Sequence, residues 1–373
     1  MNRPRVLFVV TEDWYFVTHR LPLAVAAQEA GFEVAVATRE TTHGGTIRNS
    51  GIGLIPFTLA RRSGNPVSEI VRLIALFRRE KPDIVHLVAL KPVLYGGIAA
   101  RLAKVPRVVN AMAGLGWLFT STGRLARWFR PALRQILVWL LSAKNSVTIM
   151  QNPDDLAALQ QAGVPRARLR LIRGAGVDVA AFAPPPAAPP VPVTVMLVAR
   201  MLWDKGVGEF VEAARQLCEQ GVQARFVLVG EPDPANPASI PSSKLHEWHG
   251  RNTIEWWGRL EDMPAVLRQA HIACLPSFYG EGLPKSLLEA AAMGLPIVTT
   301  DAPGCREVVS DGDNGFLVPV RDAAALTVAL ARLIANPDLR TRMGLRSRER
   351  ALADFSQTQI IKQVLQLYRE RLP

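Results

Sequence analysis

The sequence predicts an α/β protein with two doubly wound parallel sheets, one after the other along the chain, facing a central cleft. Short apolar runs alternate with longer helical patterns, which is typical of parallel strands joined by crossover helices. A proline-rich stretch at residues 183–192 interrupts the alternation, which then starts again. At 373 residues the chain is long enough for two domains, each with its own core.

The first half of the chain contains seven candidate strands. They are residues 6–10, 33–37, 54–57, 84–87, 108–111, 147–150 and 169–172. The stretch Ala183-Pro-Pro-Pro-Ala-Ala-Pro-Pro-Val-Pro192 cannot form a helix or a central strand, so it is predicted to be a semi-rigid spacer. We therefore expect a first domain over residues 1–182 and a linker over residues 183–192.

The second half of the chain repeats the alternation. Its candidate strands are residues 193–199, 225–229, 253–256, 272–275 and 296–299. We expect a second domain over residues 193–355, followed at 356–373 by a helix that could return to the first domain. Ligands bind beyond the carboxyl ends of the strands in such sheets, so the chemistry is expected in the loops there.

Composition excludes several classes of protein. With 49% hydrophobic and 20% charged residues, the chain is predicted to be globular rather than disordered. Three well-separated cysteines, Cys218, Cys274 and Cys305, have no CxxC spacing, which favours a reducing compartment. Residues 5–10 are too short for the core of a signal peptide, and no apolar run is long enough to span a bilayer. A cytoplasmic location is therefore expected.

The positive charge of the chain lies in its first half. Residues 1–182 hold 24 Lys and Arg against 11 Asp and Glu, whereas residues 183–373 hold 20 against 21. This asymmetry indicates that the first domain meets an anionic partner, either nucleic acid or the acidic inner face of a membrane. An arginine-rich soluble surface is the simpler alternative.

One segment after a predicted buried strand has the chemistry of an anion site. In Glu281-Gly-Leu-Pro-Lys-Ser-Leu-Leu-Glu289, Gly280 and Gly282 allow a tight turn, and Pro284 suits the first helical position. The free N–H groups of that helix N-terminus favour a diphosphate. The two glutamates can each accept hydrogen bonds from a diol, one from a ribose and one from a hexose. An ordinary loop-to-helix connection would have the same spacing.

A second segment places two cations after the first strand of the second domain. Arg200 and Lys205 lie in the strand-to-helix turn where doubly wound folds bind phosphate, and could neutralise a diphosphate leaving group in place of a metal ion. Asp204 is predicted to cap the following helix. A basic turn without function is the alternative. No GxGxxG follows the first strand, which removes the main support for a dinucleotide site.

Other polar residues are interpreted as structural or as weaker candidates. Asp311-Gly-Asp313 resembles a metal-binding DxD but continues as Asn-Gly, so a turn is predicted. No two histidines have the spacing of a metal site on a helix, and no metal is expected. His86 ends a predicted strand and His19 follows another. Either could deprotonate or orient an acceptor hydroxyl, or be a structural histidine.

The segment Arg124–Leu141 predicts a basic amphipathic helix. At 100° per residue, four arginines fall on one side and the apolar residues on the other; the arginines are Arg124, Arg127, Arg130 and Arg134. This is the pattern of a helix that lies on an anionic membrane. A core helix with an exposed arginine stripe would also give it, and Pro131 could split the segment in two.

At these residues the chain resembles glycosyltransferase family 4, the retaining GT-B enzymes. The pattern consists of an E-x7-E pair, an Arg-x4-Lys pair, and Pro303-Gly-Cys-Arg-Glu-Val-Val309 before a glycine-rich turn. Over nearly its whole length the chain is similar to a bacterial subgroup that extends lipid-diphosphate-linked sugars for surface polysaccharides or protein glycosylation. That narrower likeness is carried by Thr18-His-Arg-Leu-Pro22, Lys91-Pro-Val-Leu-Tyr-Gly96, Gly114-Leu-Gly116 and Asn152-Pro-Asp-Asp155.

The resemblance implies a role for each matching residue. Arg200 and Lys205 would hold the diphosphate of a UDP-sugar, Glu281 the donor sugar and Glu289 the ribose. The backbone from Gly280 through Gly282 to Leu283 would contact phosphate or sugar, and Gly258 would lie near the base. The family also implies an acceptor in the first lobe, attack from the face that the leaving group departs, and no metal or cofactor.

The acceptor side departs from the family pattern. Many members carry a histidine after the fifth strand of the first lobe, whereas this chain reads Asn110-Ala-Met-Ala-Gly114. His86 remains a candidate for catalysis by its own position, and His19 and Lys91 are weaker candidates for acceptor contact.

We expect a hexose or N-acetylhexosamine to pass from a UDP-sugar to an undecaprenyl-type lipid-diphosphate acceptor. The enzyme would be peripheral on the inner face of the cytoplasmic membrane, which it would contact through Arg124–Leu141, and no nucleic-acid partner is expected. A GT-B nucleotide-sugar 2-epimerase and a non-catalytic, membrane-associated sugar-binding scaffold are the alternatives.

Overall fold

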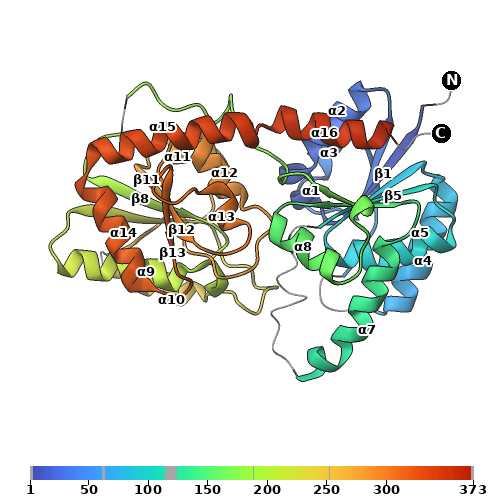
Figure 1. Ribbon diagram of the computed structural model, residues 1–373, viewed down its shortest axis with the longest axis horizontal. Helices are drawn as coiled ribbons and strands as arrows, with labels where there is room; N and C mark the ends of the chain where they lie inside the picture. The colour runs from blue at the N-terminus through green and yellow to red at the C-terminus, as the bar shows by residue number, and fades with distance from the viewer. Residues whose placement is uncertain are drawn as a thin grey trace. The chain divides into compact units, whose positions relative to one another are not determined.

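The computed structural model describes residues 3–60, 64–112, 114, 124–187, 189–251 and 253–370, with the backbone alone for 124–130. The chain forms two compact units (Figure 1). The first comprises Met1–Ala175 and Gln359–Pro373, and the second comprises Gly176–Thr358.

The first unit contains a parallel sheet of seven strands in the order β3-β2-β1-β4-β5-β6-β7. The direction of strand addition reverses between β1 and β4, as the predicted doubly wound topology requires. The strands are β1 (Arg5–Glu12), β2 (Glu33–Arg39), β3 (Gly53–Pro56), β4 (Ile84–Val88), β5 (Arg107–Ala111), β6 (Ser146–Met150) and β7 (Leu169–Leu171).

Helices cover both faces of this sheet. One face packs against α1 (Asp13–His19), α2 (Leu21–Glu29), α3 (Gly44–Asn49) and α16 (Gln357–Arg369). The other packs against α4 (Pro66–Glu80), the π-helical η1 (Pro92–Gly96), α5 (Gly97–Leu102), α7 (Arg124–Leu141) and α8 (Pro153–Gln161). A short η2 (Arg166–Arg168) precedes β7. The apolar alternation along the strands supplies both cores, because successive side chains point to opposite faces.

The second unit contains a parallel sheet of six strands in the order β10-β9-β8-β11-β12-β13. The strands are β8 (Val193–Val198), β9 (Ala224–Val229), β10 (Glu255–Trp256), β11 (Ile272–Leu275), β12 (Ile297–Thr300) and β13 (Gly315–Val318). Its helical segments are η3 (Trp203–Lys205), α9 (Val207–Glu219), α10 (Ser242–Gly250), α11 (Met263–Leu267), α12 (Lys285–Ala292), α13 (Cys305–Val308), α14 (Ala323–Ala335) and α15 (Pro337–Asp354).

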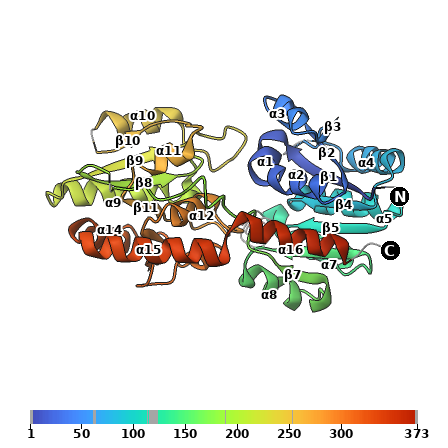
Figure 2. The same ribbon diagram turned by 90° about the horizontal axis from the view of Figure 1, so that it is seen from above.

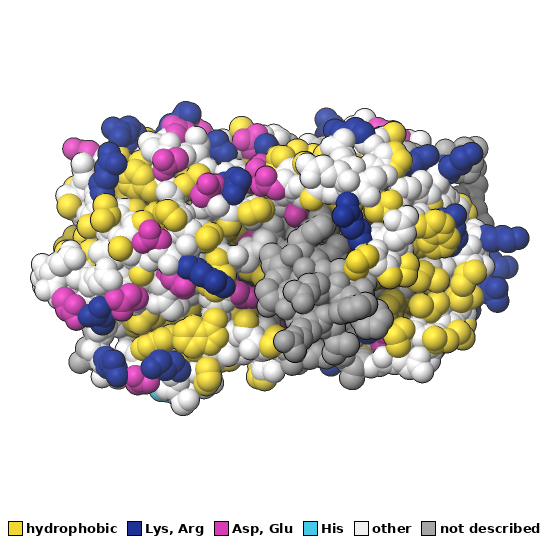
Figure 3. Space-filling view, turned by 60° about the horizontal axis from the view of Figure 1, so that its bottom comes forward, with side chains coloured by type: hydrophobic (Ala, Val, Ile, Leu, Met, Phe, Trp, Pro, Cys, Tyr) yellow, Lys and Arg dark blue, Asp and Glu magenta, His cyan; other side chains and the backbone are white. Residues whose placement is uncertain are grey.

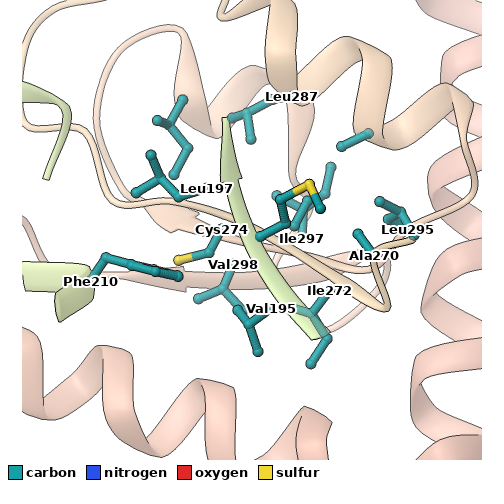
Figure 4. Packing of buried hydrophobic residues seen from close by; sticks show 14 of the residues in the cluster. Val195, Leu197, Phe210, Ala270, Ile272, Cys274, Leu287, Leu295, Ile297 and Val298 are labelled. Carbon is teal, nitrogen blue, oxygen red and sulfur yellow. The ribbon is translucent and has the colours of Figure 1, made fainter. Parts of the chain in front are cut away.

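The core of the second unit lies around its central strands. Figure 4 shows Phe210 of α9 beside Cys274 and Val298, with Leu287 of α12 on the other side of the sheet. All four are at most 2% exposed. This packing fixes the ends of β8 and β11, from which the loops of interest leave.

The unit boundary differs from the predicted linker. The chain passes to the second unit at Gly176, before the proline-rich stretch, because Val177 and Phe182 are buried in the second core. The backbone N–H of Val177 also donates to Phe355 O, at 2.9 Å. After Thr358 the chain returns, and α16 packs on the sheet of the first unit (Figure 2).

Several local predictions can be compared with the structure. Asn152, in a segment that carries the narrower likeness, caps α8 by accepting from the backbone N–H of Asp155 at 2.8 Å. The segment Arg124–Leu141 forms one helix that continues through Pro131. The side chains of its first three arginines, and most of Gly114-Leu-Gly116, lie outside the described residues. Within the part of the chain that is described, no helix is long and apolar enough to cross a membrane.

Candidate functional site

The predicted anion-binding segments meet at the point where strand order reverses in the second sheet. There β8 and β11 are neighbours although about 75 residues separate them in the chain, so the loops that follow them leave the sheet side by side. The turn after β8 carries Arg200 and Lys205, and the loop after β11 carries Gly280, Glu281 and Gly282.

Two backbone contacts hold the turn after β8 against the end of β11. Gly206 has φ +73°, and a Cβ at this position would collide with the carbonyl oxygen of Pro276. The backbone N–H of Phe278 donates to Asp204 O at 3.1 Å. Gly206, not Asp204, is the N-cap residue of α9, which corrects the predicted capping role of Asp204. Burial raises the pKa of the Asp204 carboxyl, the charge of Glu281 acts in the same direction, and Lys205 and Arg200 oppose it.

Ser277 joins the two segments. Its hydroxyl is fully buried and lies 3.0 Å from Glu281 Oε1 and 3.1 Å from Asp204 O, so its proton can serve either oxygen. Lys205 Nζ contacts the same Glu281 oxygen and forms an ion pair with it. The structure therefore brings together two of the residues that the sequence singled out, through a serine to which no role was assigned.

Gly304 packs against the backbone of the loop that carries Glu281. Its φ is +82°, and a Cβ there would lie 2.5 Å from Gly282 O and 2.6 Å from Glu281 O. The loop then passes through the buried Leu283 to Pro284, which is the N-cap residue of α12 rather than its first residue. Any side chain at position 304 would therefore displace the loop.

Glu289 lies in the second turn of α12 and is 7% exposed. Burial raises the pKa of its carboxyl, and Lys285, 3.4 Å away, partly offsets the effect. A carboxylate in this setting costs free energy unless it is hydrogen-bonded. A ligand hydroxyl would supply such a bond, so the burial is compatible with the ribose contact predicted for Glu289.

Arg200 and Gly258 occupy the neighbouring loops. Arg200 Nη1 lies 2.7 Å from Oδ2 of Asp233, which is in the loop after β9. The carbonyl oxygen of Gly258, after β10, accepts from the backbone N–H of Gly230 at 2.7 Å. Gly258 thus lies at the same edge of the sheet as the turn after β8.

This group of residues can bind an anion joined to hydroxyl-bearing rings. Two cations and the amides at the start of α12 suit phosphate oxygens, and the carboxylates suit hydroxyl groups. Over the described ranges, no group of three or more His, Cys, Asp or Glu side chains is placed to hold a metal ion. Asp311-Gly-Asp313 forms the predicted turn, in which Gly312 has φ +75° and Asp311 Oδ1 accepts from Leu317 N at 2.9 Å.

His86 is in the core of the first unit. It is 0% exposed, stacks on Phe8, and its Nδ1 lies 2.5 Å from the hydroxyl of Tyr368 in α16. Burial, together with the positive charge of Arg20, holds the pKa of His86 well below its usual value. A neutral imidazole enclosed in this way cannot reach a substrate hydroxyl. The structure therefore contradicts the catalytic role predicted for His86 and assigns it a packing role.

Lys91 and His19 lie near a pocket of about 280 Å³ in the first unit, at the carboxyl ends of β1 and β4. Lys91 lines this pocket and pairs with Glu69 at 2.7 Å. His19 stacks on Tyr15, which also lines it, with ring centroids 4.2 Å apart.

Sequence reasoning missed the residues that hold the site together. Ser277, Gly206 and Gly304 bring loops into contact that are far apart in the chain, and Asp233 pairs with a predicted ligand. Gly304 belongs to a motif that the resemblance had marked, and that motif was its only signal. The others have no sequence signal, because their roles depend on the strand order.

Comparisons with known proteins cover most of the chain. Residues 5–152 match the family model described as glycosyl transferase 4-like, and residues 192–336 match the one described as glycosyl transferases group 1. A Campylobacter jejuni relative, N,N'-diacetylbacillosaminyl-diphospho-undecaprenol alpha-1,3-N-acetylgalactosaminyltransferase, is 27% identical over 94% of this chain and 94% of its own length.

Another relative and one solved structure extend the comparison. The Escherichia coli UDP-Gal:alpha-D-GlcNAc-diphosphoundecaprenol alpha-1,3-galactosyltransferase is 26% identical over 81% of this chain and 79% of its own. The crystal structure of Anabaena Alr3699/HepE in complex with UDP-glucose superposes with a TM-score of 0.79 at 18% identity, over 98% of this chain and 99% of that one. That likeness concerns the fold.

Proposed function

The chain belongs to the family 4 glycosyltransferases and has their GT-B fold, and we propose that it moves a hexose or N-acetylhexosamine from a UDP-sugar to an undecaprenyl-type lipid-diphosphate acceptor. The observation that carries the donor half is the grouping of Arg200, Lys205 and Glu281 at the strand-order reversal of the second sheet. The two undecaprenol-linked relatives support the acceptor half.

In this proposal each donor-site residue has one task. Arg200 and Lys205 bind the diphosphate and stabilise the negative charge that develops on it as the sugar leaves. Glu281 accepts hydrogen bonds from the donor sugar, and Glu289 from the ribose. The backbone from Gly280 to Leu283 approaches phosphate or sugar, and Gly258 lies near the base.

The transfer is proposed to retain the anomeric configuration without a metal ion. The acceptor oxygen forms a bond to the anomeric carbon on the face from which the diphosphate oxygen departs. The proton of the acceptor hydroxyl passes to the departing diphosphate. The two cations take the place that a divalent ion has in metal-dependent transferases. With His86 buried, this route needs no histidine base.

The pocket at the ends of β1 and β4 is proposed to contact the acceptor. Glu12 and Lys91 line it, and both already have charged partners, Arg39 at 2.7 Å and Glu69 at 2.7 Å. Trp14 and Tyr15 add aromatic surface. A lining of paired charges and aromatic rings suits a neutral sugar better than a phosphate group.

Exposed hydrophobic side chains on α4, α5 and α7 support the proposal of a lipid-linked acceptor and of a peripheral location on the inner membrane face. Five of the six large hydrophobic side chains exposed in the described part of the first unit lie on these helices: Val67, Val71, Leu102, Ile136 and Trp139. Arginines accompany them, and the guanidinium of Arg101 lies 4.0 Å from the Trp139 ring centroid. Figure 3 shows hydrophobic and basic side chains gathered on this face.

Vesicle binding tests this surface. The protein should co-sediment with vesicles containing phosphatidylglycerol but not with phosphatidylcholine alone, and salt should weaken the binding. Replacing Ile136 and Trp139 with serine should weaken it too, whereas Val328→Ser on α14 of the second unit, 70% exposed, should not. Equal loss in both variants would contradict the assignment of the surface.

The activity is tested with radiolabelled UDP-sugars and isolated lipid-linked acceptors, with and without EDTA. Transfer of label to lipid that persists in EDTA is expected. Release of free sugar or of an epimer, with no labelled lipid from any acceptor, would overturn the proposed activity. Loss of transfer in EDTA would overturn the metal-free route alone.

A further inference from the structure

Both cations of the donor site are already paired with carboxylates. Arg200 Nη1 lies 2.7 Å from Asp233 Oδ2, and Lys205 Nζ contacts Glu281 Oε1. Asp204 interacts electrostatically with both cations and with Glu281. The cluster consists of two cationic and three acidic side chains, so its formal charge is −1 when all five are ionised. These side chains are Arg200, Lys205, Asp204, Asp233 and Glu281. A diphosphate therefore meets cations whose charge is already neutralised.

Asp233 is held in place by the backbone. The segment 231–240, which follows β9, runs alongside the turn that carries Arg200. The backbone N–H of Met201 donates to Glu231 O at 2.9 Å, that of Trp203 to Ala238 O at 2.8 Å, and that of Ile240 to Met201 O at 2.9 Å. These bonds hold the backbone of the segment beside the turn, and the backbone N–H of Ala235 donates to Asp233 Oδ1 at 3.2 Å, which orients the carboxylate.

The Arg200–Asp233 pair is of a kind that a diphosphate can displace. The Arg200 side chain is 42% exposed and that of Asp233 is 13% exposed. An ion pair with one exposed partner is weak because water screens it. A guanidinium can donate two parallel hydrogen bonds to a phosphate, whose charge exceeds that of a carboxylate.

We propose that Asp233 is a counter-ion of Arg200 and that the diphosphate of the donor displaces it. When UDP leaves, Asp233 pairs with Arg200 again. The proposal rests on the proposed function, because it takes a UDP-sugar as the ligand. Lys205 makes the same exchange, so that the donor sugar replaces Lys205 as a partner of Glu281. The Asp233 carboxylate, which also accepts from the backbone N–H of Ala235 at 3.2 Å, then remains close to the bound diphosphate as a negative charge that weakens its binding and favours product release.

The size of the effect follows from Coulomb's law. A unit charge about 6 Å from one phosphate charge, at an effective dielectric constant of about 40 to 80, changes an affinity roughly three- to tenfold. Removing the charge of Asp233 should therefore tighten the binding of UDP by this factor.

Asp233→Asn tests the exchange, because it preserves the shape and an oxygen that Arg200 can donate to. Calorimetry should show UDP bound roughly three- to tenfold more tightly, with a smaller gain in 0.5 M salt, and uridine bound as before. UDP should inhibit transfer at correspondingly lower concentration. Asp313→Asn is the control, because Asp313 pairs with Arg346 at 3.0 Å elsewhere in the same unit and should leave UDP binding unchanged.

Weaker or unchanged UDP binding by the Asp233→Asn protein would overturn the exchange, and would instead make Asp233 a residue that positions Arg200 or has no role. An equal change in uridine binding would also overturn it, since uridine carries no phosphate. Wild-type protein that bound neither UDP nor any UDP-sugar would overturn the proposed donor, and the exchange with it.

Discussion

Replacing Gly304 with alanine tests how the donor loop is held. The added methyl group would lie 2.5 Å from Gly282 O and 2.6 Å from Glu281 O, closer than a carbon and a carbonyl oxygen can approach. The backbone at this position has φ +82°, which disfavours any residue with a Cβ. Both effects act on the loop that carries Glu281.

The expected cost can be worked out from these two terms. A left-handed conformation costs an ordinary residue about 1–2 kcal/mol, and a forced contact in a packed site costs about 1–3 kcal/mol. The free energy of unfolding should fall by about 2–5 kcal/mol, which lowers the melting temperature of a unit of this size by roughly 5–15 °C. A loop shift of about 1 Å should also lower kcat/KM about a hundredfold.

Gly312→Ala separates the two terms. Gly312 has φ +75°, but beyond its two chain neighbours no atom of the described residues lies within 4 Å of the place its methyl group would take, so only the conformational cost applies there. Thermal unfolding and transfer kinetics of both variants supply the comparison. If Gly304→Ala melted at the same temperature as Gly312→Ala and transferred sugar at the same rate, the close contact between Gly304 and the Glu281 loop would have no effect on stability or activity.

Four further outcomes are expected. Lys205→Ala should abolish transfer and weaken UDP binding in calorimetry, and unchanged UDP binding would make the site assignment wrong. Glu289→Gln should bind UDP about tenfold less tightly through one lost hydrogen bond, without melting earlier, because it removes a buried charge. Tyr368→Phe should lower the free energy of unfolding by about 1–3 kcal/mol and leave UDP affinity unchanged; a selective loss of transfer would restore a catalytic role for His86. Because burial holds the pKa of His86 well below its usual 6.5, the unfolded chain takes up the proton first. Stability should therefore decline as the pH falls below about 6.5, less steeply in His86→Leu, and equal slopes would contradict this.

Much of the fold could be predicted because buried parallel strands have a recognisable sequence pattern, a continuous run of apolar residues. The runs at 6–10 and 193–199 match β1 and β8 to within two residues, since a strand buried on both faces is apolar throughout. The unit boundary could not be placed in the same way. Proline content marks where regular structure stops, whereas membership of a unit depends on which core Val177 and Phe182 enter.

The donor site could be predicted in part for a related reason. Arg200, Lys205 and Glu281 each follow a recognisable strand, and the rule that ligands bind at the carboxyl ends of strands is general. His86 was misjudged by the same rule. It lies in β4, where position along the strand predicts an edge residue, but α16 returns from the far end of the chain and covers it with Tyr368. No local pattern near residue 86 records that contact.

The contacts that assemble the donor site involve backbone atoms as well as side chains. Mutations of small residues that contact this backbone should therefore affect transfer, as mutations of the charged side chains do. Gly206 lies against Pro276, and Gly304 lies against the loop of Glu281, so two small residues set the spacing between Lys205 and Glu281. Removing a charge weakens one interaction with a ligand, whereas adding a methyl group at either glycine moves several ligand-binding groups at once. Substitutions at these uncharged positions should therefore reduce transfer even though they remove no group that binds the ligand. They should also lower thermal stability, which the charge substitutions should leave nearly unchanged.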